Sequence, residues 1–283
     1  MVPKVYYYDH NGELQFTFND DEAGAYIGLE SDLKDWTIGY DTDYGLIRNM
    51  HRSKEAYTLP VVLPTDSTEL RDALVDVFTA DILAQSPGKL VVQDWELECY
   101  ITGATHEWVR ELDRVITFAV TPTFPVWIRR TTKHFGSGQG GETIVDLGRD
   151  YTLEDGVVGR GYNYGYSVAL SNQGTFNLRG EGNGYEAVIY GAVTNGVTFY
   201  INNYPISVDY NLTNGQIMKI TSNGGERTIV VMDLYGNEIS NVFDYRDKEN
   251  TPFITLPDYV VIGYGNLEMD FTAIERRSEP SWN

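Results

Sequence analysis

The feature that most constrains this chain is an apolar run that ends in two prolines. Residues 115–120 read VITFAV, and the β-branched and aromatic side chains in this run favour a buried strand. Pro122 and Pro125 follow, and because proline lacks a backbone N–H, neither can continue a sheet ladder. A stretch rich in glycine and small polar residues comes next. The sequence therefore predicts a domain boundary near residue 130 and a linker over residues 131–141.

The length and composition agree with two domains that are held together by packing. The 283 residues suffice for about two domains of ordinary size. Cys99 is the single cysteine, so an intrachain disulfide is impossible, and we expect this residue to be a small buried hydrophobe on a strand. The first residues do not have the basic and apolar segments of a signal peptide, and no apolar run approaches about 18 residues. We expect neither a secretory nor a membrane-spanning segment.

The chain carries a formal net charge of −20, and both halves share it. Residues 1–130 hold 22 acidic and 11 basic side chains, and the remaining residues hold 19 and 10. Tight binding to nucleic acid requires many Lys and Arg contacts to phosphates, so this composition argues against a DNA-binding protein. Such a charge keeps a large assembly soluble. A surface lined with acidic side chains also lets DNA pass without binding it.

The first half reads as mainly β, in a barrel or sandwich with one α-helix. Residues 5–18 predict a hairpin, because two β-favouring runs flank Asn11-Gly12, a dipeptide suited to a tight turn. Residues 67–84 predict a helix, in which Asp66 and Glu69 form a capping box at the first turn. The helix has one apolar stripe at helical spacing, formed by Leu70, Leu74, Val77, Phe78 and Ile82.

The strand that follows this helix carries a pair of carboxylates. Apolar and polar residues alternate over residues 95–101, which places Glu96 and Glu98 on one face of the strand. Glycosidases hold two carboxyl groups at a set separation, so a glycan hydrolase that uses this pair is one hypothesis. The same pattern is typical of an ordinary solvated strand face, which is the interpretation that we favour.

The other candidate sites fail on spacing. Asp20, Asp21 and Glu22 are consecutive, so on an extended chain they point in different directions. Asp41 and Asp43 resemble the start of a calcium loop, but Arg52 stands at position twelve, where a bidentate Glu is required. The histidines lack the spacing of metal ligands; they are His10, His51, His106 and His134.

Glycine-rich segments also occur at residues 136–141 and 159–165, but neither lies between a buried strand and a helix, as a phosphate loop does. The sequence therefore predicts no catalytic, cofactor-binding or metal-binding residue and no cofactor, and the chain is not expected to be an enzyme.

From residue 142 onward the sequence predicts an antiparallel β-sandwich, because strand-like runs recur between Gly or Asn turns. These runs cover residues 186–190, 197–201, 216–221 and 227–232. Tyrosine rings in this half offer flat faces on which sugars could stack, although tyrosines in sheets and turns are more often structural. The candidates are Tyr162, Tyr164, Tyr166, Tyr185 and Tyr200.

In this order the elements resemble the distal tail proteins of long-tailed, siphovirus-type bacteriophages. The likeness to the N-terminal ring domain of that family rests on the helix over residues 70–83 and on residues 88–92 and 114–127. The later runs are similar to the galectin-like C-terminal domain of the family, although the sugar-binding signature of true galectins is not recognisable. These later runs cover residues 214–220, 236–243, 253–257 and 267–274.

The resemblance implies a hexameric hub at the distal end of the tail tube, which connects the tube to the baseplate or tail fibre and leaves a channel for DNA. Residues 1–130 would form the ring and residues 142–283 the galectin-like sandwich, with an inter-subunit hairpin within residues 95–115. The implied partners are further copies of the chain, the tail tube protein, and a baseplate hub or receptor-binding protein.

The implied location is the virion, at the tail tip, after assembly in the cytoplasm of the host bacterium. No membrane is involved, and DNA is only passing cargo. The alternative hypothesis is a carbohydrate-binding adhesion module that acts through the C-terminal sandwich and recognises a host surface glycan.

Overall fold

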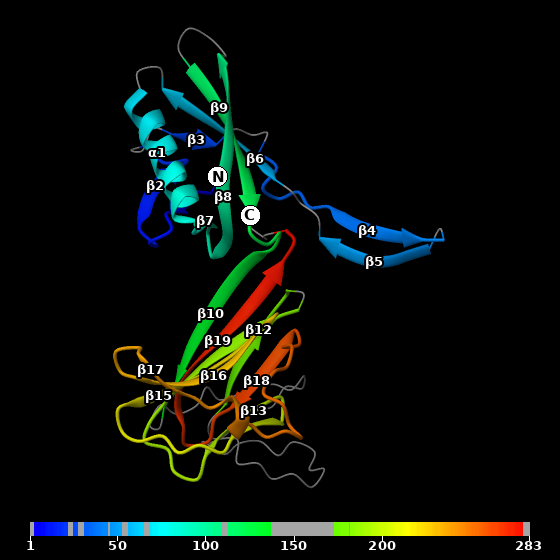
Figure 1. The fold of residues 1–283 in the computed structure, drawn as a ribbon, viewed down its shortest axis with the longest axis vertical. Helices are drawn as coiled ribbons and strands as arrows, with labels where there is room; N and C mark the ends of the chain where they lie inside the picture. Colours follow the sequence, from blue (N-terminus) through cyan, green and yellow to red (C-terminus); the bar gives the residue numbers. More distant parts are fainter. Residues whose placement is uncertain are drawn as a thin grey trace, which may run out of the picture. The chain divides into compact units, whose positions relative to one another are not determined.

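The computed structural model describes residues 3–21, 25–27, 31–44, 46–52, 56–64, 68–108, 113–136, 173–180 and 182–279. The chain divides into two compact units (Figure 1): unit 1 comprises Met1–Arg129 and Arg276–Asn283, and unit 2 comprises Arg130–Glu275. Both consist mainly of antiparallel strands, and unit 1 adds an α-helix, which confirms the predicted fold class. Within the described ranges, no helix has the length and apolar character that crossing a membrane requires.

Unit 1 is an antiparallel sheet that packs against one helix, α1. The strands pair in the order β2, β1, β7, β8, β9, β6 and β3. A separate pair, β4 and β5, forms a two-stranded arm. The bounds are β1 Val5–Tyr8, β2 Leu14–Phe18, β3 Tyr26–Ile27, β4 Ile38–Asp43, β5 Leu46–Arg52, β6 Tyr57–Pro64, α1 Thr68–Ala84, β7 Gly88–Val92, β8 Trp95–Trp108 and β9 Asp113–Pro122.

The predicted N-terminal hairpin is confirmed as strands β1 and β2. Its turn is built by Asp9, whose carboxylate accepts the backbone N–H groups of Asn11 and Glu13, each at 2.9 Å. Gly12 has a φ of 79°, a conformation that glycine adopts without steric cost. Alternation along β1 buries the side chain of Tyr7 completely.

Helix α1 occupies the predicted position, but the prediction for one residue of its apolar stripe is wrong. Leu74 and Phe78 are buried, whereas Ile82 is 45% exposed. The rings of Tyr7 and Phe118 meet Phe78 edge-on, at centroid distances of 4.9 and 5.2 Å. The predicted cap Asp66 lies outside the described residues. The helix therefore packs on the sheet mainly through its middle turns.

A buried carboxylate, Asp81, stands on the inner side of α1 near its C-terminal end. Its Oδ2 accepts a hydrogen bond from the Tyr7 hydroxyl at 2.5 Å, and its Oδ1 lies 2.7 Å from His10 Nδ1 and 3.0 Å from the His10 backbone N. A buried carboxylate is tolerated only when such partners replace water. This network ties the helix to the first hairpin. It also holds the pKa of the Tyr7 hydroxyl far above its usual range, through burial and the bond to Asp81.

The proline-terminated exit is confirmed, although its two aromatic residues behave differently. Strand β9 ends at Pro122, and strand β10, Trp127–Phe135, begins after a short bend. Trp127 is completely buried, as expected, but Phe124 is 59% exposed, so the expectation that Phe124 packs is wrong. Of the two aromatic residues in this exit, Trp127 alone is packed in the protein interior.

The start of the expected linker is strand instead. Residues 131–135 belong to β10, where Thr132 Oγ1 lies 2.8 Å from Thr272 Oγ1. Threonine is β-branched and favours a strand, which explains the difference. The C-terminal residues also depart from the expected division, because Arg276–Asn283 group with unit 1. There the Arg277 guanidinium lies 5.9 Å from the ring centroid of Trp95.

Unit 2 is an antiparallel β-sandwich, as predicted. One sheet has the order β17, β16, β15, β12, β19 and β10, and the other has the order β11, β18, β13 and β14. A single 3-10 turn, η1, follows β17 in the described part of this unit. The bounds are β11 Gln173–Asn177, β12 Gly184–Tyr190, β13 Val197–Ile201, β14 Tyr204–Val208, β15 Gln216–Asn223, β16 Glu226–Asp233, β17 Glu238–Asn241, η1 Phe243–Tyr245, β18 Tyr259–Gly263 and β19 Glu268–Arg277.

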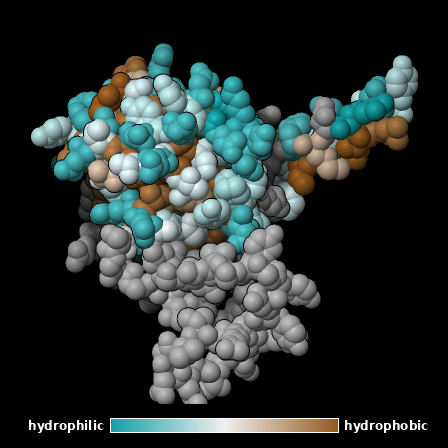
Figure 2. Space-filling view, turned by 90° about the horizontal axis from the view of Figure 1, so that it is seen from below, coloured by the Kyte–Doolittle hydropathy of each residue, from teal (hydrophilic) through white to brown (hydrophobic). Residues whose placement is uncertain are grey.

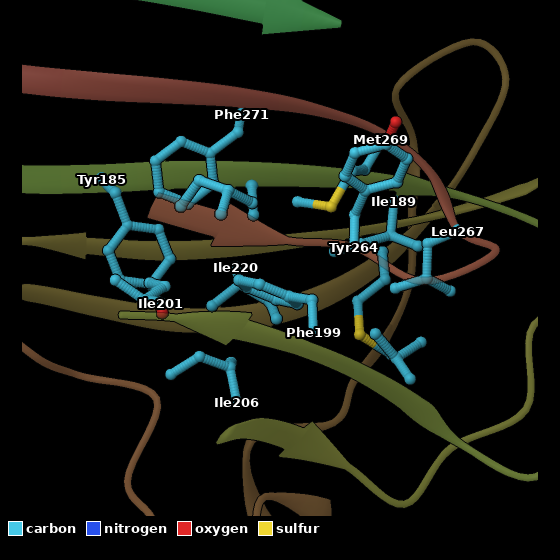
Figure 3. Packing of buried hydrophobic residues seen from close by; sticks show 14 of the residues in the cluster. Tyr185, Ile189, Phe199, Ile201, Ile206, Ile220, Tyr264, Leu267, Met269 and Phe271 are labelled. Carbon is cyan, nitrogen blue, oxygen red and sulfur yellow. The ribbon is translucent and has the colours of Figure 1, made fainter. Parts of the chain in front are cut away.

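Aromatic rings join the two sheets of the sandwich around Phe271 (Figure 3). The ring of Tyr185, on the same sheet, stacks on Phe271 at a centroid distance of 5.2 Å. From the other sheet, Phe176 and Phe199 approach to 5.5 and 6.4 Å. Because all four side chains are buried, Phe271 is a central contact of the core.

We predict that Gly88→Ala destabilises unit 1 by about 1–3 kcal/mol or more, the usual cost of overpacking. A Cβ at Gly88 would lie 2.2 Å from Tyr7 Oη and 2.7 Å from Asp81 Oδ2, both of them buried atoms. All five tryptophans belong to unit 1, so urea unfolding followed by tryptophan fluorescence reports on this unit alone. Gly103→Ala is the control, because its nearest new contact is 3.8 Å away. Equal midpoints for the two variants would refute the prediction.

We also predict that Phe271→Ala lowers the stability of unit 2 by about 3–5 kcal/mol, the range for removing a buried Phe side chain. Scanning calorimetry of the full chain measures this loss. The matched control is Tyr235→Ala, since Tyr235 is 91% exposed and its removal should change stability by no more than about 0.5 kcal/mol. A loss below about 1 kcal/mol for Phe271→Ala would show that this ring is not central to the core.

Candidate assembly surfaces

The predicted pair of carboxylates lies on a strand face, as the alternation indicated. In β8, Trp95, Leu97 and Cys99 are buried, so Glu96 and Glu98 share the opposite face. The carboxylate of Glu96 forms an ion pair with Lys89 of β7 at 3.1 Å. Glu98 is exposed. The lone cysteine is buried as expected, and this burial raises the pKa of the Cys99 thiol to about 12.

The acidic residues singled out as possible metal ligands are engaged in other contacts. Asp20 accepts a hydrogen bond from Lys4 at 2.5 Å, and Asp21 accepts one from the Tyr26 hydroxyl at 3.1 Å. Asp43 forms an ion pair with Arg48 at 3.3 Å. Asp41 also belongs to strand β4, so neither carboxylate lies in a calcium-type loop, and Glu22 is outside the described residues. In the part of the chain that the structure describes, no three acidic, His or Cys side chains are grouped as a metal site.

The four histidines lie apart, on different elements. His10 contacts Asp81 in unit 1, whereas His134 Nδ1 lies 2.6 Å from Asp270 Oδ1 in unit 2. Asp270 also accepts a hydrogen bond from the Tyr190 hydroxyl at 2.6 Å, which raises the pKa of Tyr190 to about 12. The remaining two, His51 in β5 and His106 in β8, are exposed.

Of the five tyrosines proposed as sugar platforms, the structure describes two, and they differ in exposure. Tyr185 is completely buried in the core, so that candidate is wrong, whereas Tyr200 is 47% exposed on β13. Tyr162, Tyr164 and Tyr166 lie outside the described residues. The same is true of residues 159–165 and of residues 137–141 in the two glycine-rich segments.

The β4–β5 arm carries an exposed apolar surface that was not predicted from the sequence. Its pairing register places Tyr40 opposite Met50 and Thr42 opposite Ile47. Beside Thr42, this face carries four apolar side chains, and between 45% and 67% of each of the four is exposed. Figure 2 shows hydrophobic residues along one side of this projecting arm and hydrophilic residues along the other. We call Ile38, Tyr40, Ile47 and Met50 the apolar face of the arm.

The opposite face of the arm carries Asp41, Asp43 and His51 together with Leu46. Among the described strands, β4 and β5 pair only with each other. A lone two-stranded hairpin is marginally stable in water, and exposed apolar patches mark interaction sites. An amphipathic arm of this kind is suited to lie on another polypeptide surface.

A second exposed apolar surface lies on the outer side of helix α1. Val75 and Ile82 are 40% and 45% exposed, and Leu83 is 78% exposed. We call these three residues the helix patch. In Figure 1, α1 and the arm leave the unit 1 sheet on opposite sides. Unit 1 therefore has two separate exposed apolar surfaces, on different elements.

The hairpin expected within residues 95–115 exists as strands β8 and β9. Their pairing continues from Cys99 opposite Pro122 to Trp108 opposite Arg114, with an irregularity between Ile101 and Gly103. Residues 102–106 of β8 are exposed. Its role between subunits stays a prediction.

Comparisons with known proteins find likeness in structure. No family model and no curated protein matches the chain. A structure of SPP1 Dit, described as a hub adsorption apparatus of phages that infect Gram-positive bacteria, has a TM-score of 0.57 and 9% identity. This match covers 98% of the present chain and 100% of the other.

Chains of the phage P2 baseplate, in its activated conformation with calcium or strontium, have TM-scores of 0.55 and 0.53 and identities of 12% and 11%. Each match covers 99% of the present chain and 100% of the other. At such identities the likeness shows the fold alone. The resemblance predicted from the sequence is thus confirmed: this chain has, over nearly its whole length, the fold of a phage distal tail protein.

Proposed function

We propose that this chain is a structural hub protein of a bacteriophage tail, which assembles into a closed ring of six copies at the distal end of the tail tube. The proposal is supported by the fold, which matches SPP1 Dit and phage P2 baseplate chains from end to end. In this proposal the chain is a virion component and not an enzyme. The ring connects the tube protein to a baseplate or receptor-binding protein.

The observation that carries ring assembly is the amphipathic arm. Its apolar face and the helix patch lie on different elements, so a contact between them joins unlike surfaces of two copies. Contacts of this heterologous kind produce either closed rings or open filaments. The arm of one copy covers the helix patch of the next, and each copy then buries both surfaces. The apolar area removed from water favours this contact by about 25 cal/mol for each Å².

The charge of the chain fits a ring with a DNA channel. With 21 basic against 41 acidic side chains, the chain as a whole repels phosphates, so DNA would pass without being held. The ring also presents six copies of unit 2, and such multivalency strengthens weak contacts to a partner or a host surface without new chemistry. Unit 2 would therefore serve as the outward-facing domain.

The rival hypothesis is an adhesion module that binds host glycans through the C-terminal sandwich. It loses one of its predicted stacking residues, because Tyr185 lies in the core. It also offers no account of the exposed apolar arm on unit 1, which a hub explains. We therefore favour the hub.

We predict that the full chain forms a species of six times its 32.0 kDa mass, measured by native mass spectrometry over a range of concentrations. The double variant Tyr40→Ser/Met50→Ser, on the apolar face of the arm, should weaken assembly at least tenfold, because each residue would be an apolar anchor of the contact. The matched control, Asp41→Ser/His51→Ser, alters the opposite face of the same strands and should assemble normally.

Two results would contradict the ring. One is a wild-type chain that stays monomeric at every concentration and salt. The other is an assembly that both double variants form equally well, because the contact would then not involve the apolar face of the arm.

A further inference from the structure

The β4–β5 arm lies outside the hydrophobic core of unit 1. That core includes Leu33, before the arm, and Tyr57, after it, but none of the described residues between these two. At the base of the arm, the N–H of Thr58 donates to the carboxylate of Asp32 at 2.5 Å. The chain is therefore held at both ends of the arm. The hairpin itself can form or open without disturbing the core, as locally unfolding segments do.

The first hairpin of unit 1 shows what the arm lacks. Strand β1 pairs with β7 as well as with β2, and Tyr7 in β1 is completely buried. The turn after β1 contains Asn11-Gly12 and is stabilised by hydrogen bonds to Asp9. Among the described strands, β4 and β5 pair only with each other, and every side chain described in them is exposed. Tertiary contacts thus stabilise the first hairpin much more than the arm.

The turn of the arm contains a residue in an unfavourable conformation. Asp43, at the end of β4, pairs with Leu46, at the start of β5, and Tyr44 in the turn between them has a φ of 49°. This left-handed conformation is costly for a residue with a bulky side chain, whereas Asn and Gly adopt it readily. Because Tyr44 is 97% exposed, packing within the chain does not offset the cost.

The strands of the arm also contain residues that are uncommon in sheets. Gly39 and Asp41 lie in β4, and Asn49 is paired with Asp41 in β5. Gly, Asp and Asn are all depleted in strands. The pairing register also shifts between Asp41 and Thr42. An isolated two-stranded hairpin is at best marginally stable in water, and these features lower the stability of the arm further.

We propose that the arm is a strap that folds as it docks. Its hairpin is only partly populated in a free copy, and it becomes the dominant form when the arm covers the helix patch of the next copy. This inference rests on the ring proposed above, because a second copy supplies the apolar cover. The apparent affinity between copies is then reduced by the fraction of arms that are folded before docking.

Such a strap also limits wrong contacts before assembly. A rigid hairpin with an apolar face and two free strand edges is a template for unspecific pairing with other chains. A free copy whose arm is mostly open does not present that surface as a continuous sheet edge. Folding and docking therefore occur together, on the helix patch.

Hydrogen exchange of the full-length protein, followed by mass spectrometry of its peptides, tests this coupling. The variant Ile82→Ser/Leu83→Ser provides a free copy with an unchanged arm, because it alters the helix patch at residues that are 45% and 78% exposed. In this variant, the amides of β4 and β5 should exchange at least about tenfold faster than those of β1 and β2, the internal control. In the assembled wild type, the amides of the arm should be protected.

Substitutions at Tyr44 test the coupling from the turn, outside the apolar face of the arm. Tyr44→Asn places Asn before Gly45, which gives the dipeptide that most favours a tight hairpin turn. Tyr44→Ala is the matched control, because it also removes the ring but does not favour the left-handed conformation. Tyr44→Asn should assemble at a concentration about three- to tenfold lower than Tyr44→Ala, since more of its arms are folded before docking.

Four results would overturn the inference. If the wild type assembles into six copies but the arm of the free variant exchanges as slowly as β1 and β2, the ring stands and the folding step is wrong. Equal assembly concentrations for Tyr44→Asn and Tyr44→Ala would have the same meaning. Assembly of Ile82→Ser/Leu83→Ser at wild-type concentrations would show that the arm docks elsewhere. A wild type that stays monomeric at every concentration removes the ring, and the strap with it.

Discussion

The role that we propose for unit 1 depends on the apolar face of the β4–β5 arm. A two-stranded hairpin has no second layer, so the face that carries Ile38, Tyr40, Ile47 and Met50 cannot be buried by the arm itself. Natural proteins seldom leave such surfaces and free strand edges open to water. Covering them with a neighbouring copy removes the apolar area from water and pairs the arm with a stable partner. In the proposed ring, the neighbouring copy would therefore stabilise the arm.

Elsewhere in unit 1, a buried hydrogen-bond network ties the helix to the sheet. Asp81 connects helix α1 to the first hairpin through Tyr7 and His10, and Gly88 leaves the space that this network needs. Unit 2 has a different design, in which one aromatic cluster around Phe271 holds two sheets together.

Much of this fold could be predicted from local patterns, because strands and helices bury one face with a fixed period. The hairpin around Gly12, the helix, the exit at Pro122 and the sandwich all follow from such patterns. Predictions failed where a tertiary contact decided the outcome. Ile82 is exposed because the helix turns Asp81 inward, and Tyr185 is buried because Phe271 stacks on it.

The two candidate surfaces were harder to predict, because both depend on segments whose composition suggests something else. In the arm, Asp41 and Asp43 suggested a calcium loop and concealed the alternation of Ile38, Tyr40 and Thr42, which was the available signal. The helix patch includes Ile82, whose helical spacing indicated a buried position. Electron microscopy of the purified full chain tests whether six copies close into a ring. Class averages should show a sixfold ring with a central hole, whereas isolated monomers or open filaments would contradict the account.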